Sequence, residues 1–227
     1  AETHLLRAVA AHPGFMVGYW NLGTVRQRRQ DWQGAAAALE QAVRLQPQHF
    51  EVRRLLARAY LMDKRYSEAE RELRGLLETH PEDINGEFYL AWALAKQGRD
   101  LEADVVFRRG LEKAPDWPTA MAQGAWLLAT HPDDVRRNGS LARFQAEMAL
   151  RALKAIEKQP DENLLEAAAA ASAECGDFDA ALAYQTAALR LPNLPTERKA
   201  EMEKRLRLYQ QKQPYRLVAS DRRSEPP

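Results

Sequence analysis

The sequence predicts an all-α protein, and more narrowly an α-solenoid made of antiparallel helix pairs. The composition favours helices, because alanine, leucine, glutamate, arginine and glutamine dominate while β-branched residues are scarce. Proline recurs every 34 residues, at Pro13, Pro47, Pro81 and Pro115. Small residues recur with the same period, at Gly23, Ala57, Ala91 and Ala125. A period of this length, built from helical segments, is typical of stacked helical repeats.

Each period contains two amphipathic stretches separated by a short polar turn. Residues 50–63 and 67–79 form one such pair, with apolar side chains at helical spacing on both sides of the turn. The repeated proline ends the second helix, because it has no backbone N–H with which to continue the hydrogen-bond pattern. The same reasoning predicts helices near 17–29, 33–45, 51–63, 67–79, 85–97, 101–113, 118–130, 140–158, 162–175 and 178–190.

Gly23 lies in the middle of the first of these predicted helices. It stands in the stretch YWNLG, at positions 19–23, which continues into TVRQRRQ without a turn signal. Glycine inside a helix costs about 1 kcal/mol relative to alanine, so the position needs a reason. A second column of small residues, Ala35, Ala69 and Ala103, supplies one, because small residues on both helices allow a close approach. Large apolar columns accompany them, namely Leu22, Leu56 and Leu90, and Leu39, Leu73 and Phe107.

The stretch YWNLG, the 34-residue period and the closing prolines resemble the tetratricopeptide repeat family. The resemblance implies a right-handed superhelix of about five repeats, near 16–49, 50–83, 84–117, 118–160 and 162–194. It is strongest in the first three, because the turn of the fourth repeat, ATHPDDVRRNGS, is longer than its counterparts. An amphipathic segment over 196–211 is expected to cap the array and complete a repeat domain of residues 1–211. Residues 212–227 are polar and are expected to form a flexible tail.

The chain begins in the middle of a repeat. Ala1, Leu5, Ala8 and Pro13 fit the columns of a second helix, so an N-terminal half-repeat is expected before the first full repeat. A half-repeat leaves an apolar face without a neighbour. We therefore expect the array to be the C-terminal part of a larger, bacterial-type protein.

Charge and hydropathy exclude several classes of partner. The 33 basic and 32 acidic residues leave a net charge of +1, which gives no argument for nucleic acid or a membrane surface. Basic residues prevail in the segment from Thr196 to Glu225, and we interpret them as the solvated face of a cap rather than as an RNA site. No apolar run approaches the roughly 20 residues of a membrane span, and no signal peptide is evident. A soluble protein is expected, in the cytoplasm or the periplasm.

The sequence contains no catalytic or cofactor-binding constellation. It lacks a phosphate-binding glycine loop, a nucleophile elbow and HExxH, so we expect no enzyme activity and no cofactor. None of the five histidines is paired at the spacing of metal ligands, and we expect no metal. The single cysteine, Cys175, stands between Glu174 and Gly176, followed by Asp177. Acidic neighbours disfavour a thiolate, so a structural role is favoured.

The resemblance also implies where a ligand would bind. In this family the first helices of successive repeats line a concave groove that binds peptides or partner domains. Carrying those positions to this sequence predicts a peptide-binding groove at Trp20, Asn21, Thr24, Arg54, Arg58, Phe88, Tyr89, Trp92, Gln123 and Trp126. Ala122, Glu166, Ala170 and Leu55 belong to the same rows.

Two features of these rows suggest a ligand chemistry. Trp92 and Trp126 occupy equivalent positions one repeat apart, and with Phe88 and Tyr89 they could form an aromatic wall. Arg54 and Arg58 lie one helical turn apart and could hold a carboxylate. Such a surface suits an extended segment with an apolar or aromatic anchor and an acidic group. The alternative is that the aromatic residues belong to the core and that the arginines pair with glutamates such as Glu51.

One subclass of the family clamps the acidic C-terminus of heat-shock chaperones with lysine, asparagine, asparagine, lysine and arginine. The matching positions here are Trp20, Thr24, Leu55, Asn85 and Tyr89, so we expect no chaperone carboxylate clamp. The sequence thus predicts a non-catalytic scaffold that binds a peptide segment or partner protein in its groove. An alternative is a C-terminal recognition or regulatory module of a larger enzyme or envelope protein whose chemistry lies upstream.

Overall fold

The computed structural model describes residues 2–217 and divides the chain into two compact units. Unit 1 spans Ala1–Ala114 and unit 2 spans Pro115–Pro227. The division follows a repeat boundary, because Pro115 is one of the periodic prolines.

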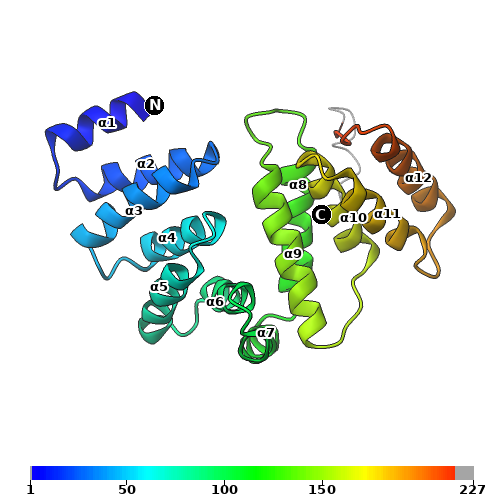
Figure 1. The fold of residues 1–227 in the computed structure, drawn as a ribbon, viewed down its shortest axis with the longest axis horizontal. Coiled ribbons are helices and arrows are strands. Elements are labelled where there is room, and N and C mark those ends of the chain that lie inside the picture. The colour runs from blue at the N-terminus through cyan, green and yellow to red at the C-terminus, as the bar shows by residue number, and fades with distance from the viewer. Residues whose placement is uncertain (1, 218–227) are drawn as a thin grey trace. The chain divides into compact units, whose positions relative to one another are not determined.

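Unit 1 contains seven helices among its described residues (Figure 1). They are α1 (Glu2–Ala11), α2 (Met16–Arg28), α3 (Trp32–Leu45), α4 (Phe50–Met62), α5 (Tyr66–Thr79), α6 (Ile84–Lys96) and α7 (Asp100–Lys113). Each helix packs against the next one in the chain, and α4 also contacts both α2 and α6. The first helices of successive repeats, α2, α4 and α6, therefore lie next to one another.

Unit 2 contains the remaining five helices of the described chain. They are α8 (Trp117–Thr130), α9 (Gly139–Ala155), α10 (Glu162–Glu174), α11 (Phe178–Leu189) and α12 (Thr196–Gln210). The pairs α8 with α9 and α10 with α11 are helical hairpins, and α10 also packs against α8 and α9. Helix α12 follows the last hairpin and packs on α11.

The observed helices confirm the prediction of an all-α protein built from helix pairs. All ten expected helices are present, with bounds that differ from the expected ones by at most three residues. The largest difference is at the end of α9, which stops at Ala155, whereas the sequence predicts helix to residue 158. There Glu157 adopts φ 55° and ends the helix in the left-handed region.

Local sequence explains where several helices begin. Asp31, Asp83, Asn138, Asp161 and Asp177 each accept a hydrogen bond from the backbone N–H three residues later. A side-chain oxygen at this position satisfies one of the N–H groups that a helix leaves without a partner at its start. These caps fix the beginnings of second helices such as α3 and of first helices such as α10.

The turns inside the hairpins of unit 1 also repeat with the 34-residue period. Gln30, Lys64 and Gly98 follow the first helices and adopt φ values of 61°, 63° and 77°. A residue in the left-handed region ends a helix and reverses the chain direction, and only Gly98 can adopt it without a steric penalty. The period thus extends to the backbone conformation of single residues.

The predicted columns form the core. Ala35, Ala69 and Ala103 are completely buried, and so are Leu39, Leu73 and Phe107 on the same second helices. On the first helices Leu22, Leu56 and Leu90 are buried as well. Each helix hairpin therefore presents its large apolar residues to small ones on its partner, which allows dense packing.

The close contact at Gly23 explains why the helix contains a glycine. A Cβ atom at this position would lie 2.5 Å from Cγ of Leu39 on α3, and 2.9 Å from its Cδ2. Both distances are far below van der Waals contact, and Leu39 has no exposed surface into which it could move. Helix α2 can approach α3 this closely only because residue 23 has no side chain.

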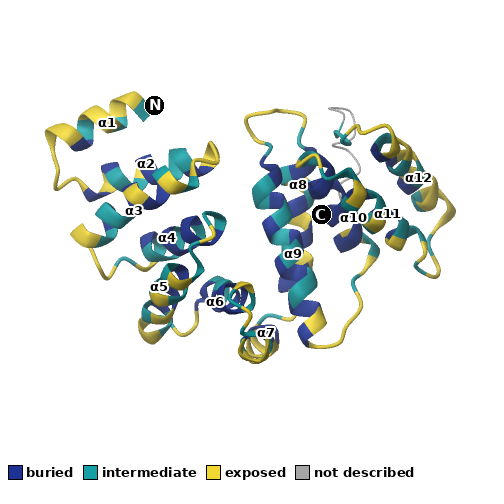
Figure 2. Cartoon of the chain, in the orientation of Figure 1, coloured by how far each residue is buried: buried dark blue, intermediate teal, exposed yellow. Residues whose placement is uncertain are grey.

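In unit 2 a run of alanine has the same effect over a whole helix. Every residue of α10 from Leu164 to Ala173 is buried, and Figure 2 shows most of this helix in the buried colour. These small side chains let α10 pack against α8, α9 and α11 at once.

The long turn of the fourth repeat joins α8 and α9. Its end is fixed by a hydrogen bond from the Asn138 N–H to the Leu128 carbonyl.

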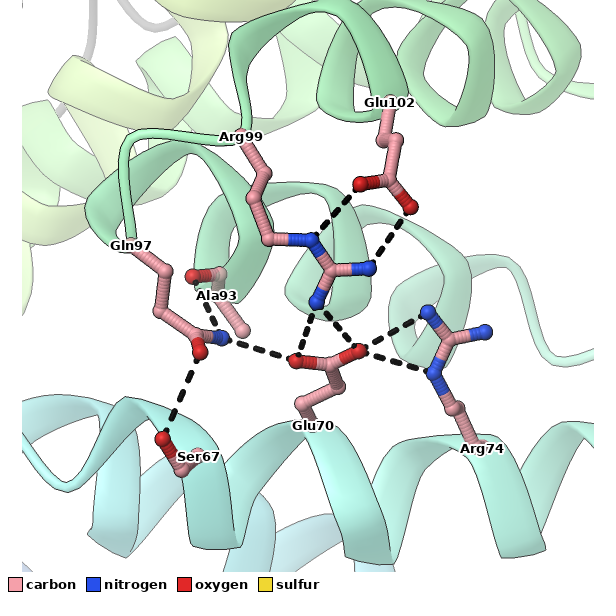
Figure 3. A network of polar contacts seen from close by, with 7 residues as sticks. All are labelled: Ser67, Glu70, Arg74, Ala93, Gln97, Arg99 and Glu102. Carbon is pink, nitrogen blue, oxygen red and sulfur yellow. Dashed lines mark hydrogen bonds and ion pairs between the residues drawn. The ribbon is translucent and has the colours of Figure 1, made fainter.

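A polar network links successive repeats of unit 1 (Figure 3). Glu70 on α5 accepts hydrogen bonds from Arg99 Nη1 at 2.8 Å, Arg74 Nε at 2.8 Å and Gln97 Nε2 at 2.9 Å. Arg99 also donates to both oxygens of Glu102. Burial raises the pKa of the Glu70 carboxyl, but the hydrogen bonds from Gln97, Arg74 and Arg99 outweigh it, so the pKa lies below its ordinary value.

The close contact at Gly23 predicts that Gly23→Leu destabilises the protein. We expect a loss of about 2 kcal/mol or more in the free energy of unfolding, on the scale of overpacked cores. The measurement is urea unfolding followed by circular dichroism. Gly14→Ala is the matched control, because a Cβ at Gly14 meets nothing within 4 Å. An unchanged unfolding midpoint for Gly23→Leu would rule out the close-packing explanation.

The Glu70 network predicts a pH-dependent effect of Glu70→Gln. A carboxyl group with a lowered folded-state pKa stabilises the protein above its unfolded-state pKa, and this contribution disappears as the pH falls through the folded-state pKa. The variant should therefore be less stable than the wild type by about 1–3 kcal/mol at neutral pH, with the difference shrinking below about pH 4. Thermal melts between pH 3 and 7 measure it, with the exposed Glu112→Gln as control. A difference that does not depend on pH contradicts the assignment.

Candidate functional site

The predicted groove residues of unit 1 lie on the first helices α2, α4 and α6. Asn21 is exposed, while Trp20, Thr24 and Tyr89 are partly buried. The Trp20 ring meets the His49 ring edge-on, with centroids 4.9 Å apart, and Thr24 Oγ1 donates to the Trp20 carbonyl at 3.0 Å. We call this surface the α2–α4–α6 face and define it by Trp20, Asn21, Thr24, Arg54, Arg58 and Tyr89.

The two arginines of this face link neighbouring first helices. Arg54 Nη1 lies 3.0 Å from Oδ2 of Asp83, the buried residue that caps α6. The Arg58 guanidinium donates to Oε1 of Gln27 on α2. Gln27 Nε2 in turn donates to the Leu55 carbonyl on α4 at 2.9 Å. The arginines therefore have internal partners, Asp83 and Gln27 in place of the glutamates considered from the sequence, and Arg54 remains 31% exposed.

Two of the predicted groove aromatics are buried instead. Phe88 has no exposed surface, and it lies beside Phe107, with ring centroids 6.1 Å apart, and against Gly110. Trp92 is 6% exposed, and Lys96 Nζ lies 4.3 Å from its ring. Both fit the alternative that these aromatic residues belong to the core, so we leave them out of the candidate surface. Trp126 lies in the other unit, on α8.

The corresponding surface of unit 2 lies on α8 and α10. Gln123 is exposed, Trp126 is partly buried, and Ala122 and Ala170 are buried. The Arg205 guanidinium of α12 lies 5.0 Å from the Trp126 ring and 4.9 Å from the Tyr215 ring. We call this surface the α8–α10 face and define it by Gln123, Trp126, Thr130, Glu166, Ala170 and Glu174.

A buried carboxylate holds the arginine in place. Glu166 is 1% exposed, and its carboxylate accepts a hydrogen bond from Arg205 and pairs with Arg198 Nη2 at 2.6 Å. Gln185 Nε2 lies 3.4 Å from Glu166 Oε1 and donates to the Met202 carbonyl at 3.2 Å. A buried charge is stable only with such partners, so this cluster fixes α12 to α10.

Residues 213–217 pass over the α8–α10 face after α12 ends. The Tyr215 ring lies 5.7 Å from the Trp126 ring, and Arg216 Nη2 lies 2.6 Å from Glu174 Oε2. The backbone N–H of Leu217 donates to the carbonyl of Thr130, the last residue of α8, at 2.9 Å. The sequence predicts a flexible tail over 212–227, yet residues 213–217 make these contacts. The rest of the predicted tail, 218–227, lies outside the described residues.

Sequence reasoning missed several residues that build this face. Arg205 was expected to be a solvated charge of the cap, but only 6% of it is exposed. Glu166 contained the available signal, because a carboxylate between apolar residues on a first helix requires a cation from elsewhere in the chain. Tyr215, Thr130 and Glu174 gave no signal, since their contacts depend on where the C-terminal segment turns after α12.

Other candidate sites give no evidence of chemistry. Across residues 2–217, no group of three or more His, Cys, Asp and Glu side chains could hold a metal ion. Cys175 is exposed, but partial desolvation of its thiol by neighbouring groups raises its pKa and outweighs the opposing effect of Arg143, so the reactive thiolate is disfavoured. None of the helices in the described part of the chain has the length and apolar character required to cross a membrane.

Comparison with known proteins agrees with this geometry. Residues 28–87 match a family model described as tetratricopeptide repeat. A tetratricopeptide repeat protein from Parabacteroides merdae has a similar structure, with a TM-score of 0.54, 15% identity, and coverage of 92% of this chain and 76% of that one. A thermophilic protein of the same kind from Thermus thermophilus has a TM-score of 0.48 and 18% identity, over 86% of this chain and 99% of its own. A search of curated protein sequences found no match.

The helix pairs, the 34-residue columns and the family match define a helical repeat protein. More specifically, residues 28–87 match the tetratricopeptide repeat model, and the fold of the chain is similar to that of a tetratricopeptide repeat protein. Arrays of such repeats are generally non-catalytic scaffolds for protein–protein interaction. This is the class of function that the fold implies.

The Glu166 cluster predicts that Glu166→Ala is strongly destabilising. The substitution leaves Arg205 buried without its carboxylate, and we expect a loss of about 3 kcal/mol or more in unfolding free energy. Urea unfolding measures it. Glu201→Ala is the control, because Glu201 pairs with Lys204 in solvent and should change stability by about 0.5 kcal/mol at most. Equal midpoints for the two variants would show that the buried cluster does not stabilise unit 2.

Proposed function

We propose that this chain is a non-catalytic scaffold that binds an extended peptide segment or partner protein on the surfaces formed by its first helices. The observation that supports this most directly is in unit 2, where the α8–α10 face accommodates residues 213–217 of the chain itself. That segment contributes a ring, a guanidinium group and a backbone N–H to the face. Recognition of extended segments by repeat surfaces uses these same kinds of contact.

The α2–α4–α6 face of unit 1 is the equivalent surface with different side chains. Trp20 and Tyr89 offer aromatic surface, and Arg54 and Arg58 offer guanidinium groups that already bridge neighbouring helices. Because Arg54 is 31% exposed while its pair with Asp83 orients it, it could accept a second carboxylate without reordering. We therefore propose that the partner presents an apolar or aromatic anchor together with an acidic group.

The proposal predicts that Asn21→Glu impairs binding of the partner. Asn21 is exposed on α2, and a new negative charge there would repel an acidic ligand and compete for the guanidinium groups of the face. We expect at least a tenfold drop in the amount of partner that is captured from cells of the source organism, measured by quantitative mass spectrometry.

Gln33→Glu is the matched control for this experiment. It introduces the same carboxylate at an exposed position of the second helix α3, away from the first-helix surface. Circular dichroism should show the same helical content for both variants and the wild type. Equal capture by Asn21→Glu and Gln33→Glu would contradict a binding surface at α2–α4–α6.

A further inference from the structure

Residues 213–217 leave α12 through a fixed turn. Lys212 adopts φ 56°, and the backbone N–H of Gln213 donates to the Leu208 carbonyl at 2.9 Å. This pattern ends the helix and sets the direction of the following chain. Because the turn is held by α12, the short segment begins at a defined point beside the α8–α10 face.

Tyr215 provides the anchor of the segment. Its ring packs against the buried cluster of Ala169, Ala173, Ala181 and Tyr209, and it faces Trp126 at 5.7 Å. The Arg205 guanidinium lies within 5.0 Å of both rings. An aromatic ring therefore fits between a tryptophan, a fixed cation and small apolar side chains, a combination that favours aromatic groups.

The next two residues add polar contacts in sequence order. Arg216 pairs with Glu174 at the end of α10, and the Leu217 N–H donates to the Thr130 carbonyl at the end of α8. The last carbonyls of a helix have no partner within the helix, so an incoming N–H satisfies one of them. The three contacts together define a pattern of an aromatic residue, then an arginine, then a backbone N–H.

We propose that residues 214–217 are an intramolecular ligand of the α8–α10 face, and that this face binds partner segments in which an aromatic residue is followed by arginine. Such a partner displaces the resident segment. The inference rests on the proposed function of the first-helix surfaces, and it adds the ligand chemistry and the means of control for one of them. It assigns unit 2 a different ligand from unit 1, because Glu174 selects a basic residue where Arg54 selects an acidic one.

The covalent link between α12 and residues 214–217 opposes displacement of this segment by a free peptide. A ligand joined to its site by a short linker, here the three residues 211–213 after α12, has an effective concentration in the millimolar range, so weak contacts suffice to keep it bound. A free peptide of the same sequence must compete with that concentration, so its apparent affinity is its affinity for the open face multiplied by the fraction of molecules whose face is open. The resident segment therefore sets a threshold for binding.

The test uses a dye-labelled peptide KQPYRL, which has the sequence of residues 212–217, and full-length protein. The variant Tyr215→Ala/Arg216→Ala removes the resident contacts and opens the face. Fluorescence anisotropy should show at least tenfold tighter binding of the peptide to this variant than to the wild type. Gln211→Ala/Gln213→Ala changes exposed residues on the same segment and should behave as the wild type does.

Two further controls locate the site and the chemistry. Adding Trp126→Ala to the opened variant should abolish binding of the peptide, and the peptide KQPARL should not bind the opened variant. Circular dichroism confirms that each variant is folded. Light scattering checks that the wild type does not associate through its C-terminal segment as its concentration rises.

Several outcomes would overturn the inference. Equal peptide binding to the wild type and the opened variant would show that residues 214–217 are not a resident ligand. It would not contradict binding of the peptide to the α8–α10 face. Absence of binding to the folded, opened variant at millimolar peptide would show that the face does not recognise this chemistry. That result would not affect the Asn21→Glu experiment, which tests the proposed function on the other unit. Association of the wild type that Tyr215→Ala abolishes would show that the segment binds a second copy instead.

Discussion

The close approach of the two helices within each hairpin is the constraint on which the rest of the structure depends. Its clearest instance is the contact between Gly23 and Leu39, where a single added Cβ would overlap the leucine side chain. Because the two helices of a hairpin lie this close together, the next repeat can pack against the hairpin and bury the hairpin's apolar face. The alanine columns extend the same arrangement through unit 1, and the alanine run of α10 extends it in unit 2.

Close packing also determines where polar chemistry can exist. On α2 the small residue Gly23 faces the hairpin partner α3, and on the first helices long polar side chains such as Arg54 point towards the neighbouring repeat. There they connect neighbouring repeats, as Arg54 does with Asp83 and Arg205 does with Glu166. Arg54 also belongs to the α2–α4–α6 face, and Arg205 lies against Trp126 of the α8–α10 face. Under the proposed function, stability and recognition are coupled at these positions, since an arginine already oriented by an internal carboxylate loses little freedom on binding a ligand.

The two candidate surfaces differ in charge although they occupy equivalent positions. In unit 1 the face presents guanidinium groups, whereas in unit 2 Glu166 and Glu174 lie behind and beside the aromatic residues. A repeat fold keeps its backbone geometry while each repeat changes its side chains. This difference underlies our proposal that the two faces bind segments of opposite charge.

The prediction from sequence succeeded for periodic features and failed for residues whose environment is set by distant parts of the chain. The columns of Leu39, Leu73 and Phe107 predicted buried positions because the same local pattern recurs. Phe88 shows the limit of this reasoning: it occupies a groove position by register, but its ring turns towards Phe107 and Gly110, where the missing side chain leaves room. Register along a helix does not specify the direction of a large side chain.

The sequence by itself determined the helix pairs, their bounds and the close packing at Gly23, because these follow from a 34-residue period and local hydrogen bonding. Only the tertiary structure decided which side chains share a surface. Arg205 and Tyr215 meet Trp126 across about 80 to 90 residues of sequence, and no local pattern encodes contacts between such distant positions. They arise because α12 packs on the last hairpin and directs the following segment onto α8 and α10.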